Sequence, residues 1–125
     1  MVLAIGTDIV DIQRIATSLE RTGECFAERI LSSDELDEWH RKESSAAFLA
    51  RRFAAKEAIS KALGTGIGHG VSFQHIVITN DARGAPIACL SGGAQQALQA
   101  MGGRRVLLSL SDERRYAIAH AMILA

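Results

Sequence analysis

The chain has 125 residues, of which 48% are hydrophobic and 22% are charged, and its formal net charge at neutral pH is zero. This length suits one domain that buries about two-thirds of its unfolded surface, and the composition excludes a disordered chain and favours a soluble globular one. Because only six aromatic residues are present and no basic stripe interleaves with them, nucleic-acid binding is disfavoured.

The charges are unevenly distributed along the chain. Residues 1–50 hold five basic and ten acidic side chains, whereas residues 51–125 hold nine basic and four acidic ones. We therefore expect a small anionic substrate or an acidic protein partner. The apolar run of residues 2–5 meets Asp8 too soon to be a signal peptide or a membrane span, and Cys25 and Cys89 have no paired spacing. A cytoplasmic protein without a membrane partner is expected.

Four elements are predicted in the first half of the chain. Residues 2–10 are apolar and β-branched enough for a strand, and Asp11 is a suitable N-cap for a helix that continues to about Arg21. Ser32 and Glu35 have the spacing of a capping box, which predicts a second helix through residue 39. Ser44 or Ser45 then caps a long helix that ends before residue 64.

The second half reads mostly as strands. Residues 73–79 and 86–90 predict an antiparallel hairpin around a turn at 80–84. Ser91 is then expected to cap a short helix at 94–101, and two strands are expected at 105–110 and 116–124. This order favours an α+β fold with antiparallel sheet. The last strand is apolar on nearly both faces, so either the chain's own helices or a neighbouring subunit must cover it; a homo-oligomer is slightly favoured.

The run from residue 53 to residue 70 carries the main functional pattern. Glu57 and Lys61 share one helix face, the glycines after the helix free the backbone to approach a phosphate, and Asp8 adds a second acidic segment. This combination predicts a metal-bridged phosphate site. The alternatives are a C-terminal cap with a loose turn for the glycines, an ordinary surface pair for Glu57 and Lys61, and a helix cap for Asp8.

Several segments resemble the holo-acyl-carrier-protein synthase family of phosphopantetheinyl transferases. The resemblance spans the chain in order and at family spacing, and the Lys56-Glu57 helix with its glycine loop is specific to this group. It rests on five segments: Ile5-Gly6-Thr7-Asp8-Ile9-Val10-Asp11-Ile12, Phe26-Ala27-Glu28-Arg29-Ile30-Leu31, residues 48–68, Leu108-Ser109-Leu110-Ser111-Asp112-Glu113-Arg114 and Tyr116-Ala117.

The resemblance implies that a single domain over residues 1–125 transfers the 4′-phosphopantetheine arm of coenzyme A to a serine of apo-acyl carrier protein, a step of fatty acid and lipid biosynthesis. The by-product is adenosine 3′,5′-bisphosphate. It further implies a Mg²⁺ ion held by Asp8 and Glu57, catalysis by Glu57 and Lys61, and a homotrimer with sites between its subunits. Glu57 takes the serine proton either directly or through a metal-bound water, and the sequence leaves both routes open.

The same resemblance assigns two binding surfaces. Coenzyme A is expected at Arg52, Lys61, Gly64, Thr65 and Gly66. The acidic helix of the carrier protein is expected on the first helix, at Arg14 and less surely at Arg21.

Two departures from one branch of the family affect the clamp on the nucleotide phosphates. Glu43, Ser44 and Ser45 stand where that branch has basic residues, and Asp112 stands where it has a histidine. An aspartate cannot neutralise a phosphate, and serines offer only neutral hydrogen bonds. Basic neighbours can compensate: Arg41, Lys42, Arg51 and Arg52. The alternative function is a non-catalytic trimeric nucleotide-binding module, and duplicated transferases that serve peptide synthesis are disfavoured by the short chain.

Overall fold

The two ends of the chain meet in a three-stranded antiparallel sheet. In the computed structural model, which describes residues 1–125, β1 (Val2–Asp11) pairs with β5 (Tyr116–Leu124), and β4 (Arg105–Asp112) pairs with the other edge of β5. A separate antiparallel hairpin is formed by β2 (Ile76–Asn80) and β3 (Pro86–Leu90). The predicted α+β class with antiparallel strands is confirmed.

Side-chain caps start the predicted helices where the sequence places them. The Asp11 carboxylate accepts a hydrogen bond from the Gln13 amide at the start of α1 (Ile12–Thr22). Ser32 and Glu35 form the capping box of α3 (Ser33–Arg41). Ser45 starts α4 (Ala46–Ala62) by accepting from the Phe48 amide.

Three local features differ from the sequence-based expectation. A short helix, α2 (Glu24–Ile30), follows Gly23 and was not predicted. Residues 73–75 form a 3₁₀ turn, η1, so the strand begins only at Ile76. Helix α5 (Gly92–Ala100) begins directly after Ser91, but the Ser91 side chain makes no capping hydrogen bond.

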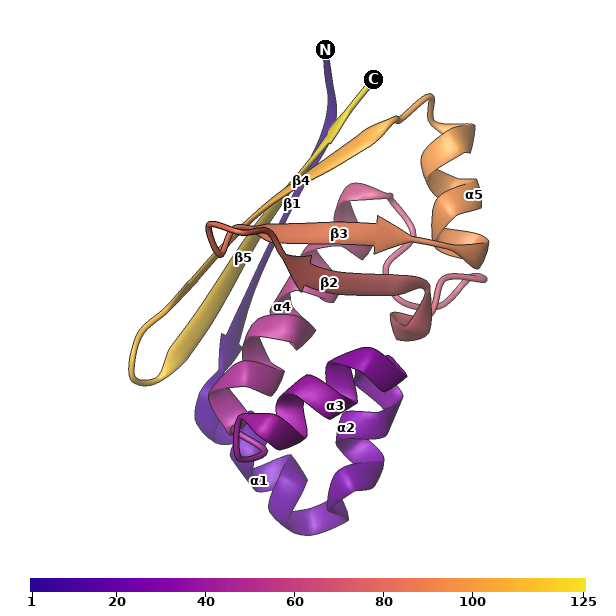
Figure 1. The fold of residues 1–125 in the computed structure, drawn as a ribbon. Coiled ribbons are helices and arrows are strands. Elements are labelled where there is room, and N and C mark those ends of the chain that lie inside the picture. The colour runs from indigo at the N-terminus through magenta and orange to yellow at the C-terminus, as the bar shows by residue number, and fades with distance from the viewer.

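The core lies between α4 and one face of the three-stranded sheet. Figure 1 shows α4 running along β1 and β5, with α1, α2 and α3 at one end of the molecule and α5 at the other. Along β5 the inward side chains, Ala117, Ala119, Ala121 and Ile123, are fully buried, while the alternate residues remain partly exposed. The chain's own helices therefore cover one face of the last strand and leave the other face uncovered.

None of the helices has both the length and the apolar character that crossing a membrane requires.

Candidate active site

Asp8, Glu57 and Lys61 meet where β1 crosses α4. The crossing is close because Gly6 has no side chain: a Cβ at this position would collide with the carbonyl oxygen of Ala58 and lie 2.8 Å from the Ala62 amide nitrogen. Asp8 lies two residues further along β1, so its side chain points to the same face of the strand. Lys61 Nζ donates hydrogen bonds of 3.0 Å to Asp8 Oδ1 and 3.0 Å to the Thr7 carbonyl.

Glu57 is half-buried beside this pair. Burial raises the pKa of its carboxyl, the negative charge of Asp8 raises it further, and the Lys61 ammonium lowers it in part. A carboxylate with a raised pKa accepts a proton more readily than an ordinary glutamate does. The i, i+4 ion pair between Glu57 and Lys61 does not form, because Lys61 bonds to Asp8 instead.

The two carboxylates suit a divalent cation that also binds phosphate. No group of three or more His, Cys, Asp or Glu side chains gathers in the structure, so Asp8 and Glu57 are the protein ligands on offer at this point. Mg²⁺ is typically bound by one or two carboxylates, with water and substrate phosphates completing its octahedron. The mutual repulsion that raises the pKa of Glu57 is the repulsion that such a cation relieves.

The glycine-rich loop begins directly after α4. Gly64, Gly66, Gly68 and Gly70 all have φ in the left-handed region, where a side chain is strained. The Gly64 amide donates to the Lys61 carbonyl at 3.0 Å, and the amides of Thr65 and Gly66 donate to Ser60. The structure thus brings Lys61 and the predicted loop residues Gly64, Thr65 and Gly66 into one region.

Arg52 lies apart from that region. It is nine residues before Lys61 on α4, which corresponds to roughly 13 Å along the helix axis. Its side chain is 4% exposed. The guanidinium packs 4.6 Å from the centre of the Phe48 ring and donates to Asn80 Oδ1 at 3.2 Å. The Arg52 Nε atom has no hydrogen-bond partner.

Arg52 borders a cavity of about 490 Å³ that Lys42 and Arg51 also line. Arg51 forms an ion pair of 3.5 Å with Asp112. Glu43 and Ser44, in the loop before α4, both have positive φ. Glu38 also lines the cavity, with its carboxylate 3.7 Å from Lys42 Nζ. The lining is therefore basic on balance, and it contains three of the four residues that the sequence analysis considered as compensating cations, Lys42, Arg51 and Arg52 but not Arg41.

Arg14 and Arg21 are exposed on α1. Neither forms an ion pair within the chain. Both guanidinium groups are available to an external partner.

Two features of the structure were not anticipated from the sequence. Lys56, next to Glu57, is fully buried and paired with Glu35 at 2.6 Å. Burial lowers the pKa of Lys56, and the Glu35 charge raises it in part. A lysine whose neighbours one helical turn before and after, Phe53 and Ile59, are both apolar, together with a glutamate already needed by a capping box, is the pattern that could have indicated this pair.

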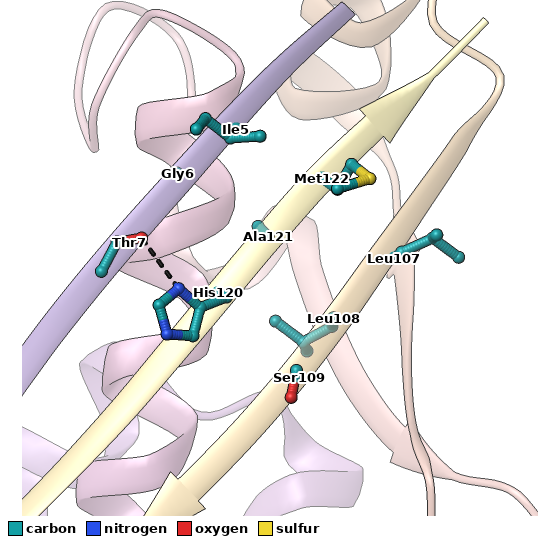
Figure 2. A pocket seen from close by; sticks show the side chains of 9 residues that line it. All are labelled: Ile5, Gly6, Thr7, Leu107, Leu108, Ser109, His120, Ala121 and Met122. Atoms are coloured by element: carbon teal, nitrogen blue, oxygen red, sulfur yellow. Dashed lines mark hydrogen bonds between the residues drawn. The ribbon is translucent and has the colours of Figure 1, made fainter. Parts of the chain in front are cut away.

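The second unanticipated feature is a shallow cavity of about 300 Å³ on the sheet face that points away from α4. Figure 2 shows the side chains that line it, from β1, β4 and β5, with Thr7 hydrogen-bonded to His120 at 3.0 Å. Most of the lining is apolar and includes Ile5, Leu107 and Met122.

Comparisons with known proteins agree with one another. Residues 4–120 match the model of the 4′-phosphopantetheinyl transferase superfamily. A holo-[acyl-carrier-protein] synthase of Vibrio parahaemolyticus is 51% identical over 122 residues, which cover 98% of this chain and 97% of that protein.

Solved structures show the same likeness. The crystal structure of the holo-[acyl-carrier-protein] synthase from Neisseria meningitidis superposes with a TM-score of 0.92 at 42% identity, covering 100% of both chains. The Helicobacter pylori enzyme of the same name, solved in complex with coenzyme A, superposes with a TM-score of 0.84 at 35% identity, covering 96% of this chain and 99% of that one.

Proposed function

The chain belongs to the 4′-phosphopantetheinyl transferase superfamily, and we propose that it transfers the 4′-phosphopantetheine group of coenzyme A to a serine of apo-acyl carrier protein, in the cytoplasm. Adenosine 3′,5′-bisphosphate is the second product. The observation that carries the proposal is the full-length similarity to synthases of this activity, together with the meeting of Asp8, Glu57 and Lys61 beside the glycine loop.

The residues have separate tasks in this reaction. The serine oxygen of the carrier forms a bond to the β-phosphorus of coenzyme A while the bond from that phosphorus to the bridging oxygen of the pyrophosphate breaks. Glu57 takes the proton that the serine hydroxyl loses, either directly or through a metal-bound water. Lys61, half exposed at the mouth of the site, neutralises charge on the phosphate oxygens as the nucleotide leaves.

Asp8 and Glu57 would hold Mg²⁺ in this proposal. They fit because they are two carboxylates from different elements, close enough for the charge of Asp8 to act on Glu57, and Mg²⁺ is typically held by one or two carboxylates with phosphate and water. The ion supplies charge neutralisation and alignment of the pyrophosphate when bound. Lys61 also contacts Asp8, so the same lysine orients that carboxylate.

Coenzyme A would extend along α4 between two regions. Gly64, Thr65 and Gly66 lie beside Lys61 and serve the reacting end. Arg52 lies with Lys42 and Arg51 in the basic cavity and binds a nucleotide phosphate. These three cations replace the positive charge that Ser44, Ser45 and Asp112 do not provide. The location of Arg52, Lys42 and Arg51 along one cavity supports this assignment.

The carrier protein would dock on α1. Arg14 and Arg21 are exposed and unpaired, and opposite charge on the two partners accelerates association and sets orientation. An acidic helix on the carrier is the complementary surface.

The uncovered sheet face supports assembly with other copies of the chain, and the family resemblance implies that the assembly is a homotrimer. Ile5 is 70% exposed, Ile9 59% and Leu107 41%, and all three side chains belong to the face of the sheet opposite α4. An apolar surface of this kind on a small domain favours burial against another subunit. In the trimer, residues of neighbouring chains would complete each active site.

The test is direct. The chain is incubated with coenzyme A, Mg²⁺ and apo-acyl carrier protein, and the carrier is weighed by mass spectrometry. We expect a gain equal to one phosphopantetheine group, and no gain with the Glu57→Ala variant. Binding of coenzyme A without any gain in carrier mass would instead favour the non-catalytic nucleotide-binding module.

A further inference from the structure

The structure contains a buried ion pair that the proposed mechanism does not use. Lys56 is 0% exposed and Glu35 is 2% exposed, and Lys56 Nζ lies 2.6 Å from Glu35 Oε1. Replacing a buried pair of this kind by apolar side chains of similar size is often neutral or stabilising. Stability alone is therefore a weak explanation for it.

All three hydrogens of the Lys56 ammonium have acceptors. Besides Glu35, the ammonium donates to the carbonyl oxygens of Ile30 at 2.6 Å and Phe73 at 3.2 Å. These carbonyls belong to the end of α2 and to η1, which follows the glycine loop. One side chain on α4 therefore holds two other segments at fixed distances.

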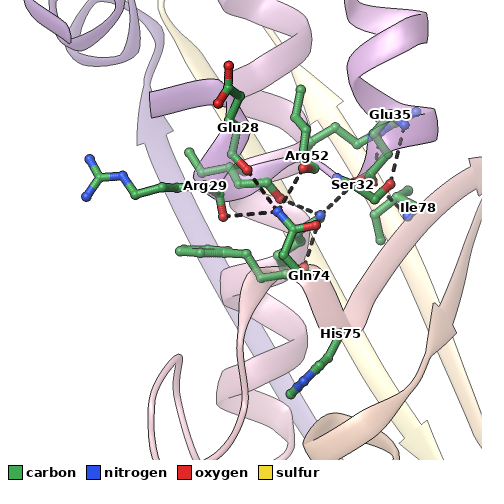
Figure 3. Close-up of polar contacts among 12 residues, drawn as sticks. Glu28, Arg29, Ser32, Glu35, Arg52, Gln74, His75 and Ile78 are labelled. Carbon is green, nitrogen blue, oxygen red and sulfur yellow. Dashed lines mark hydrogen bonds and ion pairs between the residues drawn. The ribbon is translucent and has the colours of Figure 1, made fainter. Parts of the chain in front are cut away.

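Glu35 extends the connection to two more segments. Its Oε1 atom accepts from the Ser32 amide at 2.8 Å, and its Oε2 atom accepts from the Ile78 amide on β2 at 2.9 Å. Arg52 Nε lies 3.9 Å from the same Oε2 atom. Figure 3 shows Glu35 on α3 with Ile78 beside it.

Gln74 supplies further hydrogen-bond donors to the same end of α2 that Lys56 contacts. Its side-chain amide donates to the carbonyls of Glu28 at 2.9 Å and Leu31 at 2.8 Å (Figure 3). The last carbonyls of a helix have no partner within the helix, so Gln74 and Lys56 together supply donors to this end. The contact between α2 and α4 is thereby directional, which apolar packing alone does not provide.

We propose that Lys56, through its ion pair with Glu35, is a positioning residue for the transfer reaction, an inference that rests on the proposed function. The pair fixes the turn of α4 that carries Glu57 relative to the end of α2 and to the segment leaving the glycine loop. Helix α2 packs on α1, which carries Arg14, and the glycine loop adjoins Lys61. The contacts of Lys56 therefore fix the position of Glu57 relative to both the proposed carrier-protein surface and the proposed coenzyme A site.

The test compares Lys56→Met, which keeps length and removes the charge, with Leu98→Ala. Leu98 is buried on α5, outside the site, so its truncation supplies a matched loss of stability without touching the pair. Both variants are assayed well below their melting temperatures, with turnover by the wild type establishing the activity first. Failure of the proposed function is therefore distinct from failure of this inference.

We expect kcat of Lys56→Met to fall about 100-fold, the scale of a misplacement near 1 Å, with KM for coenzyme A changed by less than about threefold. Leu98→Ala should keep kcat within about threefold of the wild type. Equal kcat in the two variants would overturn the inference. Should Lys56→Met not fold, Glu35→Gln is judged by the same kcat criterion, and loss of the fold in both variants would also overturn it.

Discussion

At the scale of single residues, the proposed site depends on two acidic side chains, Asp8 and Glu57, that lie 49 positions apart in the sequence. Asp8 and Glu57 were predicted as partners from the family resemblance, and the structure brings them close enough for the charge of one to raise the pKa of the other. Their roles as metal ligands stay predictions. The sequence could supply the residue types, but not the Asp8–Lys61 contact, which depends on how closely β1 approaches α4.

Replacing Asp8 should impair transfer much more than folding. The Asp8–Lys61 pair involves a lysine side chain that is 51% exposed, and such pairs contribute at most about 1 kcal/mol. Asp8→Asn should therefore shift the melting temperature little while transfer falls by about 100-fold or more. Asp11→Asn is the matched control on the same strand, since asparagine also caps helices, and it should retain turnover. Near-normal turnover of Asp8→Asn at limiting Mg²⁺ would show that the metal assignment is wrong.

The raised pKa of Glu57 also predicts a pH dependence of stability, measured with a chelator present. Since the pKa lies above its ordinary value near 4.5 in the folded chain, the folded state binds the proton more tightly than the unfolded state, and stability falls as the pH rises through the window above 4.5. Glu57→Gln lacks this dependence. In urea unfolding, the free energy of unfolding of Glu57→Gln should rise relative to that of the wild type as the pH is raised from 4 toward 8.

Asp8→Asn offers a check on the cause. Burial, the larger cause of the raised pKa of Glu57, remains in this variant, so without the Asp8 charge the pKa should move only part of the way back toward its ordinary value. The pH dependence of unfolding should therefore shrink without disappearing. An unchanged difference between the wild type and Glu57→Gln across this range would mean that Glu57 titrates in the folded chain as it does in the unfolded one.

At the scale of elements, short-range hydrogen bonding by capping side chains allowed the starts of three helices to be predicted from the sequence. Asp11, Ser32 and Ser45 each begin a helix through a side-chain hydrogen bond to the backbone, which requires only neighbouring residues. The missed helix α2 has seven residues, too few for its apolar spacing to stand out, and it is fixed by contacts from Lys56 and Gln74 that lie far away in the sequence. Residues 73–75 form a turn rather than strand for a related reason: Lys56 donates to the Phe73 carbonyl and Gln74 donates to the Glu28 carbonyl, and both contacts join residues far apart in the sequence.

Helix α1 yields a prediction about the carrier protein. Arg14→Glu reverses an exposed, unpaired charge on the proposed docking face, and such charges mainly affect association and its salt dependence. The apparent KM for the carrier should rise by about tenfold, while KM for coenzyme A stays nearly unchanged. Arg104→Glu is the matched control and should leave both constants unaltered: Arg104 lies between α5 and β4, and Figure 1 shows α5 at the opposite end of the molecule from α1. If Arg14→Glu weakened coenzyme A and spared the carrier, α1 would belong to the nucleotide site.

At the scale of the whole molecule, the sheet presents two different faces. The face that carries Asp8 packs on α4 and forms the core, and the opposite face carries a row of Ile5, Met122 and Leu107 followed by a row of Thr7, His120 and Ser109 across the strands. The sequence indicated that β5 was apolar on both sides and left open what covers it. The chain's own helices cover only one face of the sheet, because every helix that packs on this sheet lies on the α4 side.

The uncovered face predicts that the wild-type chain is a trimer at micromolar concentration, measured by light scattering as three times the mass of one chain. Ile5→Glu places a charge where an apolar contact would be buried, which is costly without a partner, so this variant should dissociate and lose transfer activity together. Ile87→Glu is the control: Ile87 is 43% exposed but lies on β3, outside this sheet, and its substitution should leave both mass and activity intact. A monomeric wild type with full activity would exclude the trimer and sites shared between subunits, whereas dissociation by Ile87→Glu alone would move the interface to the hairpin.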